Sequence, residues 1–412
     1  MNLFQAFAVL TTLTALFAYL NARFIKLPAP VGSLLVSLVL SLGVVFLGSA
    51  ALEGSAENFL QRLDFDSLVL QGLLSFLLFA GALNVDLDNL NRLKWPILTL
   101  ATLGLLLSTF VVGTLVYLLL GALGLALPFG YALLFGALIS PTDPIAVLAI
   151  LKQAGVSETT ETLITGESLF NDGVGVVIFS VILGTVAAGE HGGGGVSGAL
   201  TLFAQEAAGG LLFGLIVGGA AYLLLKSIDN YTVEVLITLA VVTGGYALAQ
   251  TLHTSGPLAV VVAGLFIGNR GRLLAMSEKT REHLDTFWEL IDEILNAVLF
   301  VLVGLEVVVL AFTQSYLWAA LLAIPVVLGA RLLGVGLPIT LFRLRRTFLP
   351  YTVRVMVWGG LRGGISIALA LSLPVSPERD LIIAMTYGVV VFSVLVQGLT
   401  VGWVAQRGKR GN

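Results

Sequence analysis

One short stretch of the chain carries two pairs of polar side chains at helical spacing. In Gly166-Glu-Ser-Leu-Phe-Asn-Asp-Gly173, Glu167 and Asn171 are one helical turn apart, and so are Ser168 and Asp172. The two pairs form adjacent ridges on a helix. Ser168 and Asp172 offer a hydroxyl and a carboxylate, the hard oxygen ligands that suit a small alkali cation. On the other ridge, Glu167 can neutralise a buried arginine, and Asn171 can bridge polar groups by its amide.

Two further segments combine helix-breaking residues with a charge. In Ser140-Pro-Thr-Asp-Pro144 the prolines remove backbone donors and break a helix. Carbonyls freed there, such as that of Thr142, can face a cavity and bind a cation. Asp143 would lie at the positive N-terminal end of the next half-helix, where it compensates charge and can also be a ligand. In Gly359-Gly-Leu-Arg-Gly-Gly364, Arg362 would offset the C-terminal end of the opposing half-helix.

Charges within apolar spans are costly, by a few to more than about ten kcal/mol, and therefore mark functional sites or their balancing partners. Arg331 is the natural partner of Glu167, and we predict a structural salt bridge between them. Asp172 then remains as the titrating group. A carboxylate that exchanges a cation for a proton near neutral pH needs a pKa above its ordinary value of about 3.9, which burial can provide. Three other carboxylates lie nearer to span ends, where hydration is the simpler explanation: Glu234, Glu293 and Glu306.

The composition places the chain in a membrane. It has 412 residues, of which 58% are hydrophobic and only 11% are charged, whereas soluble proteins carry roughly 25% charged residues. Apolar runs of about 20 residues recur along its length, as membrane-spanning helices require. The absence of cysteine excludes disulfides and thiolate metal sites. No phosphate-binding loop is present, so we expect a protein that is not an enzyme, without cofactor, nucleotide or nucleic-acid partner, in contact with membrane lipid.

We predict about thirteen membrane spans, and positive charges orient them. The spans lie at residues 3–21, 29–49, 67–84, 96–120, 129–151, 163–188, 203–226, 232–251, 256–269, 289–311, 316–341, 352–373 and 380–403. The polar segment 270–288 is predicted to be an amphipathic helix at the membrane surface, and the Gly-rich stretch 189–198 a loop with a solvated His191. Loops assigned to the inside hold 17 of the 21 lysines and arginines, and loops assigned to the outside hold Arg62 and Arg379. The N-terminus is therefore expected outside and the C-terminus in the cytoplasm.

Two pairs of segments indicate an inverted repeat. Lys26-Leu-Pro-Ala-Pro-Val-Gly-Ser-Leu34 opens the second span, and His253-Thr-Ser-Gly-Pro-Leu-Ala-Val260 opens the ninth. The segments 140–144 and 359–364 interrupt the fifth and twelfth. The members of each pair are seven spans apart, an odd number, so they enter the membrane in opposite directions, as in secondary transporters. We therefore predict an all-α polytopic membrane protein of two inverted repeats with two crossed, discontinuous helices.

At these residues the sequence resembles the monovalent cation:proton antiporter-1 family, the sodium/proton exchangers and their prokaryotic NhaP-type relatives. The resemblance implies that Asp172 is the essential carboxylate and that other groups surround the ion: Thr142, Asp143 and Ser168. It implies a stabilising polar network of three residues: Glu167, Asn171 and Arg331. One departure is Phe79-Ala-Gly-Ala-Leu83, which is apolar where some relatives carry an acidic residue near the ion.

The family's fold further implies a homodimer in the cell membrane that works by an elevator-like motion. Residues 67–188 and 316–403 would form the moving core, and residues 3–49 and 232–311 the dimerisation part. The neutral Asn171 beside a single titrating carboxylate favours electroneutral exchange of one cation for one proton. Na⁺ is the expected cation, with Li⁺ and K⁺ left open. The short C-terminus indicates a compact prokaryotic exchanger.

Three other functions compete with this interpretation. A sodium-coupled symporter for an organic anion would need ligands for a carboxylate or ring, whereas the sequence offers apolar walls and one compact oxygen cluster. A cation channel would need repeated backbone carbonyls or charge rings, and no such segment is visible. A non-transporting scaffold or sensor would have no reason to bury five charges: Asp143, Glu167, Asp172, Arg331 and Arg362.

Overall fold

The computed structural model describes residues 3–47, 68–125, 127–143, 145–188, 195–309 and 313–410. Within them every regular element is a helix, and extended pairing is limited to one antiparallel bridge between Asp143 and Leu361. The predicted all-helical class is confirmed. Four predictions fall outside the described residues, in whole or in part: those on Arg62, Pro144, His191 and residues 189–194 of the Gly-rich loop.

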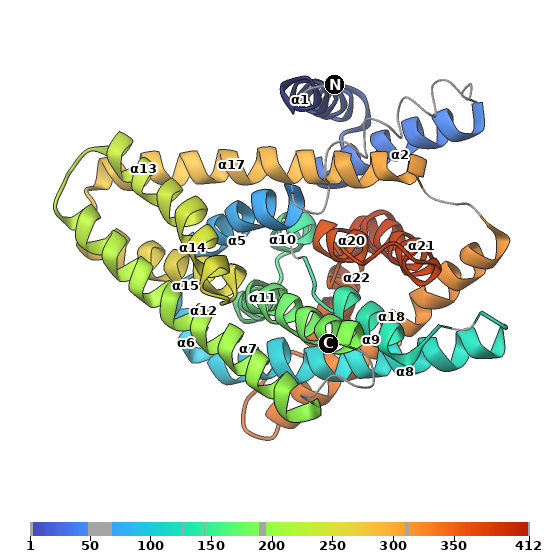
Figure 1. Ribbon diagram of the computed structural model, residues 1–412. Coiled ribbons are helices and arrows are strands. Elements are labelled where there is room, and N and C mark those ends of the chain that lie inside the picture. The colour runs from blue at the N-terminus through green and yellow to red at the C-terminus, as the bar shows by residue number, and fades with distance from the viewer. Residues whose placement is uncertain are drawn as a thin grey trace.

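Figure 1 shows how the helices of the described residues are arranged. In the text, short π-helical or 3-10 segments carry the symbol η. The first half of the chain contains α1 (Leu3–Leu20), η1 (Asn21–Ile25), α2 (Ala29–Leu47), η2 (Leu68–Leu73), α5 (Leu74–Leu83), α6 (Leu87–Arg92), α7 (Lys94–Thr99), η3 (Leu100–Gly104), α8 (Leu105–Ala122), α9 (Phe129–Ile139), α10 (Ile145–Gln153) and α11 (Glu158–Ala188). The second half contains α12 (Gly195–Lys226), α13 (Tyr231–Ala240), η4 (Val241–Gly245), α14 (Tyr246–Thr251), α15 (Gly256–Phe266), η5 (Ile267–Gly271), α16 (Arg272–Leu274), α17 (Glu278–Leu305), η6 (Glu306–Val309), α18 (Gln314–Phe342), α19 (Thr352–Trp358), α20 (Gly364–Leu371), α21 (Pro377–Phe392), η7 (Ser393–Gln397) and α22 (Gly398–Arg410).

Many of these helices have the length and the apolar composition of membrane-spanning helices. Among the described residues, seven helical segments are long and apolar enough to cross a membrane: Phe7–Ile25, Lys94–Ala122, Glu158–Ala187, Thr201–Lys226, Tyr231–Thr251, Gln314–Phe342 and Pro377–Gly408. Shorter apolar helices cover Ala29–Val45, Leu74–Leu83, Phe129–Ile139 and Gly256–Gly271. Many large apolar side chains on these helices point outward, which is stable only where lipid replaces water. The chain is therefore a multi-pass membrane protein.

Two helices are interrupted where the sequence predicts breaks. One interruption separates α9 from α10, and the other separates α19 from α20. The two breaks meet, because the backbone N–H of Asp143 donates to the carbonyl of Leu361 at 2.9 Å. Extended backbone of this kind inside a membrane domain leaves helix ends unpaired, and those ends can bind charged groups. The buried polar residues of the candidate site lie around this crossing.

The helix α17, of 28 residues, packs against the start of α20 beside the crossing. It extends along one side of the molecule, with α2 near its C-terminal end and α13 near its start (Figure 1). The helix begins with Ser277, whose Oγ accepts a hydrogen bond from the backbone N–H of Thr280. Residues 278–288 are thus continuous with the predicted span that follows them and do not form a separate helix. Their position relative to the membrane surface stays a prediction.

Small residues bring α18 close to the centre. A Cβ atom on Gly104 would lie 2.7 Å from the carbonyl oxygen of Gly334, so only glycine allows η3 and α18 to approach this closely. Near this contact α18 carries Arg331, which points toward α11. The helix α11 lies in the middle of the molecule (Figure 1) and brings the polar cluster of residues 167–172 to the crossing.

Candidate ion-binding site

Four polar side chains of α11 are buried next to the crossing. Glu167, Ser168 and Asn171 are at most 2% exposed, and Asp172 is 7% exposed. They occupy the middle of a helix of 31 residues, far from both of its ends. Polar groups buried this deeply must find partners within the protein or bind something that enters the site.

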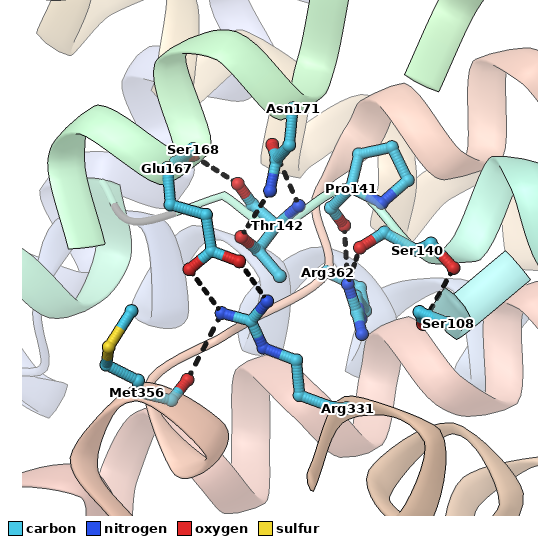
Figure 2. Close-up of polar contacts among 10 residues, drawn as sticks. All are labelled: Ser108, Ser140, Pro141, Thr142, Glu167, Ser168, Asn171, Arg331, Met356 and Arg362. Atoms are coloured by element: carbon cyan, nitrogen blue, oxygen red, sulfur yellow. Dashed lines mark hydrogen bonds and ion pairs between the residues drawn. The ribbon is translucent and has the colours of Figure 1, made fainter. Parts of the chain in front are cut away.

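Thr142, in the first break, forms hydrogen bonds with two side chains of α11. The Ser168 hydroxyl donates to its carbonyl oxygen, and the Asn171 side-chain N–H donates to its hydroxyl at 2.9 Å (Figure 2). The backbone N–H of Thr142 in turn donates to the Asn171 amide oxygen at 3.4 Å. Three contacts therefore fix the break against α11, and Ser168 faces it as predicted.

The sequence left the hydrogen-bond partner of Asn171 open. Among the described residues, both hydrogen bonds of its amide go to Thr142. The reason is geometric. The ridges are only about 100° apart on the helix, so the side chain reaches the same helix break as Ser168.

The predicted salt bridge between Glu167 and Arg331 is present. Both Arg331 Nη atoms donate to the Glu167 carboxylate, with Nη2 at 2.8 Å from Oε2 (Figure 2). Arg331 Nη2 also donates to the carbonyl of Met356 in α19 at 3.3 Å. A two-pronged contact of this type is among the strongest that arginine makes. It ties α11, α18 and α19 together on one side of the crossing.

Arg362 lies at the C-terminal end of α9, as the sequence predicts. Its Nη1 donates to the carbonyls of Ser140 and Pro141, the latter at 2.7 Å (Figure 2). Its backbone N–H donates to the Ser393 hydroxyl at 2.7 Å. Because the end of a helix carries partial negative charge, this guanidinium offsets the charge that the break exposes.

The two aspartates near the crossing differ in their surroundings. Asp143 is partly buried, and its carboxylate lies against the second break, where a Cβ atom on Gly363 would be 2.6 Å from Oδ2. It therefore sits beside the N-terminal end of α20, which favours a negative charge. Asp172 accepts no hydrogen bond from any described residue, although the polar side chains around it are paired. This carboxylate is consequently the group best placed to take a proton or a cation.

Sequence reasoning missed several residues that support the site. The Ser140 hydroxyl donates to the carbonyl of Gly136 at 2.7 Å and forms a hydrogen bond with the Ser108 hydroxyl at 2.8 Å. Ser393 anchors Arg362, and the Gln397 side chain donates to the carbonyl of Trp358 at 3.0 Å. Serine is common in membrane helices, so no sequence signal distinguishes these residues.

Comparison with known proteins identifies close relatives. A family model described as the transmembrane sodium/hydrogen exchanger matches residues 12–407. The Na⁺/H⁺ antiporter NhaP of Pseudomonas aeruginosa is 51% identical over 414 residues, which covers 99% of this chain and 96% of that protein. The Na⁺/H⁺ antiporter NhaH of Halobacillus aidingensis is 37% identical over 386 residues, covering 92% and 91%.

A solved structure shares the fold. The sodium proton antiporter MjNhaP1 of Methanocaldococcus jannaschii, determined at pH 8, superposes with a TM-score of 0.76. The match covers 98% of this chain and 99% of that chain at 22% sequence identity. The helical architecture is therefore conserved well beyond the similarity of the sequences.

Proposed function

The chain belongs to the sodium/hydrogen exchanger family, and we propose that it exchanges Na⁺ for H⁺ across the cell membrane at Asp172. The observation that carries this proposal is the Asp172 carboxylate, which is buried and accepts no hydrogen bond from the described residues. It lies on the same ridge of α11 as Ser168, next to two helix breaks.

Competition for this carboxylate couples the two ions. When Asp172 is ionised it can hold a cation, and hard oxygens nearby complete the coordination: the Ser168 hydroxyl, the Thr142 carbonyl and the Asp143 carboxylate. When Asp172 is protonated the cation is released. The site can then cross the membrane either with a cation or with a proton, so the gradient of one ion drives the other. Neither a cofactor nor a nucleotide is needed.

The remaining polar residues stabilise the arrangement of the two helix breaks at the site. The ion pair of Glu167 with Arg331 and the contact of Arg362 with the end of α9 support a role in stabilising the crossing. Asn171 adds no charge, and its amide is engaged with Thr142. One carboxylate that binds either one cation or one proton gives electroneutral exchange.

We extend the proposal to the whole chain. Residues 67–188 and 316–403 form a core that carries the crossing and moves, elevator-like, against residues 3–49 and 232–311, which hold two copies together. The two helix breaks are corresponding parts of inverted repeats within about thirteen spans. The N-terminus lies outside and the C-terminus in the cytoplasm, a topology that the distribution of lysines and arginines supports. The paired breaks and the fold shared with MjNhaP1 support this arrangement.

Reconstituted protein tests the proposal. Proteoliposomes containing a pH-sensitive dye are exposed in turn to Na⁺, Li⁺ and K⁺. We expect Na⁺ to cause a rapid pH change with the unmodified chain, and none above the background of empty liposomes with Asp172→Asn. Asp88→Asn, a change in the exposed helix α6, serves as the control and should exchange normally. Exchange by Asp172→Asn at the normal rate would overturn the assignment.

A further inference from the structure

One face of α17 carries polar residues toward the crossing. Asp292, Asn296 and Leu299 follow one another at intervals of four and three residues, so they share this face. Its contact with the broken helix is tight: a Cβ atom on Gly364 would lie 2.3 Å from a methyl carbon of Leu299. The face that includes Asp292 and Asn296 therefore meets the start of α20.

This contact joins α17 to the site. Gly363 precedes Gly364, and the Asp143 carboxylate lies against it. Leu299 and Asp143 thus touch successive residues of one helix break. Helix α17 packs directly against α20. The face of α17 that carries the polar residues is consequently next to the helix break that the Asp143 carboxylate contacts.

Asn296 has a buried acceptor without a partner. The residue is 2% exposed, and its Nδ2 donates to the backbone carbonyl of Asp292 at 2.8 Å. That bond fixes the amide plane, whereas Oδ1 has no hydrogen-bond partner among the described residues. Buried acceptors in proteins are almost always paired. An oxygen held in this way indicates a ligand from outside the chain.

The chemistry of this pair fits a cation. Asp292 is partly exposed, one turn nearer than Asn296 to the start of α17. A carboxylate followed by an amide oxygen gives two hard ligands that alkali cations prefer. Both face the crossing from the side of the membrane on which α17 begins, which is the predicted cytoplasmic side.

We infer that Asp292 and Asn296 supply additional oxygen ligands to the alkali cation when the site is open to the side on which α17 begins. This inference rests on the proposed function. It makes α17 part of the binding site in one of the two access states. In the proposed core motion, the crossing carries Asp172 away from α17 and the cation loses these two ligands. The pair then sets the affinity on one side of the membrane only.

Transport from each side tests the inference. Uptake of radiolabelled Na⁺ is measured in inside-out and right-side-out vesicles for Asp292→Asn and Asn296→Leu. Losing one charged or strongly polar ligand should raise the half-saturating Na⁺ concentration about tenfold on the side where α17 begins. We expect no change on the other side. Asp292→Glu should restore the value to within about twofold, because the ligand type is kept.

A neighbouring residue provides the control. Glu293 is exposed on another face of α17, and Glu293→Gln should leave both half-saturating concentrations unchanged. Equal shifts on both sides, or a lower maximal rate with unchanged half-saturation, would show that the pair is merely structural and would overturn the inference. The proposed function fails separately, if Asp172→Asn still exchanges.

Discussion

At the scale of single residues, the site divides into groups that are paired and one that is not. Thr142, Ser168 and Asn171 satisfy one another, and Glu167 pairs with Arg331. Asp172 is left as the acceptor whose partner must come from solution. A buried carboxylate binds a proton or a cation in preference to remaining bare, because an isolated charge in a membrane helix is costly.

The salt bridge makes a prediction about stability. Glu167→Gln or Arg331→Ala leaves a buried charge without its partner, which should lower the free energy of unfolding by about 3–5 kcal/mol. Replacing both residues, with Glu167→Leu and Arg331→Met, should recover most of that loss. Thermal unfolding in detergent measures all three variants.

An exposed ion pair provides the comparison. Lys152 and Glu161 lie 3.0 Å apart, with the lysine side chain 63% exposed, so Lys152→Gln should change the stability by less than about 1 kcal/mol. If the buried single variants melted at the same temperature as Lys152→Gln, the stabilising role of Glu167 and Arg331 would be refuted.

The hydrogen-bond and ion-pair partners of a residue were predictable from the sequence only where few candidate partners existed. Arg331 is one of two arginines in the middle of predicted spans, and the other was assigned to a helix end, so Glu167 had one available partner. The partner of Asn171 was not predictable, because an amide can reach several groups within one helical turn. The supporting role of Ser393 depends on a tertiary contact that leaves no trace in local sequence.

At the scale of helices, the two helix breaks lie in direct contact because no side chain of Gly363 separates them. The Asp143 carboxylate occupies the space where Gly363 lacks a side chain. The breaks were predictable because proline and paired glycines stop helices for local reasons. The continuity of α17 was not, because hydropathy reports which residues suit lipid, whereas the capped polar start of this helix is stabilised by its own N-terminal contacts.

The close contact at Gly363 leads to a prediction for this element. Gly363→Ala would place a methyl group 2.6 Å from Asp143 Oδ2, so the carboxylate must move. The backbone there is in the extended region, which alanine tolerates. We expect a folded protein whose half-saturating Na⁺ concentration rises about three- to tenfold, equivalent to about 0.7–1.4 kcal/mol.

Gly336→Ala in α18 is the matched control, because the nearest atom to its added methyl group would be 4.0 Å away. Identical Na⁺ dependence in the two variants, measured by dye quenching in proteoliposomes, would show that the Asp143 carboxylate does not contribute to cation binding.

At the scale of the whole molecule, family membership and helical class followed from sequence because they depend on composition and on a specific motif. The grouping of spans into a moving core and a fixed part depends on which helices pack together. Hydropathy contains no such information, which is why the division at residues 67–188 and 316–403 rests on the family's fold.

Electroneutral exchange predicts how the whole transporter responds to voltage. If one cation moves against one proton, no net charge crosses the membrane in a cycle. The initial rate of Na⁺-driven pH change should therefore be the same at zero potential and at a potential of about 100 mV. If one net charge crossed the membrane in each cycle, that potential would change the free energy of the cycle by about 2.3 kcal/mol. The potential is set with a K⁺ gradient and valinomycin. A rate that follows the potential would indicate unequal charge movement.

The most direct test of the central claim is the dependence of Na⁺ affinity on pH. If proton and cation compete for the Asp172 carboxylate, the half-saturating Na⁺ concentration should rise by about tenfold for each unit that the pH falls, once the site is mostly protonated. The maximal rate at saturating Na⁺ should stay constant. A half-saturating concentration that is independent of pH, with a maximal rate that falls instead, would show that the two ions bind at separate sites and would contradict this account.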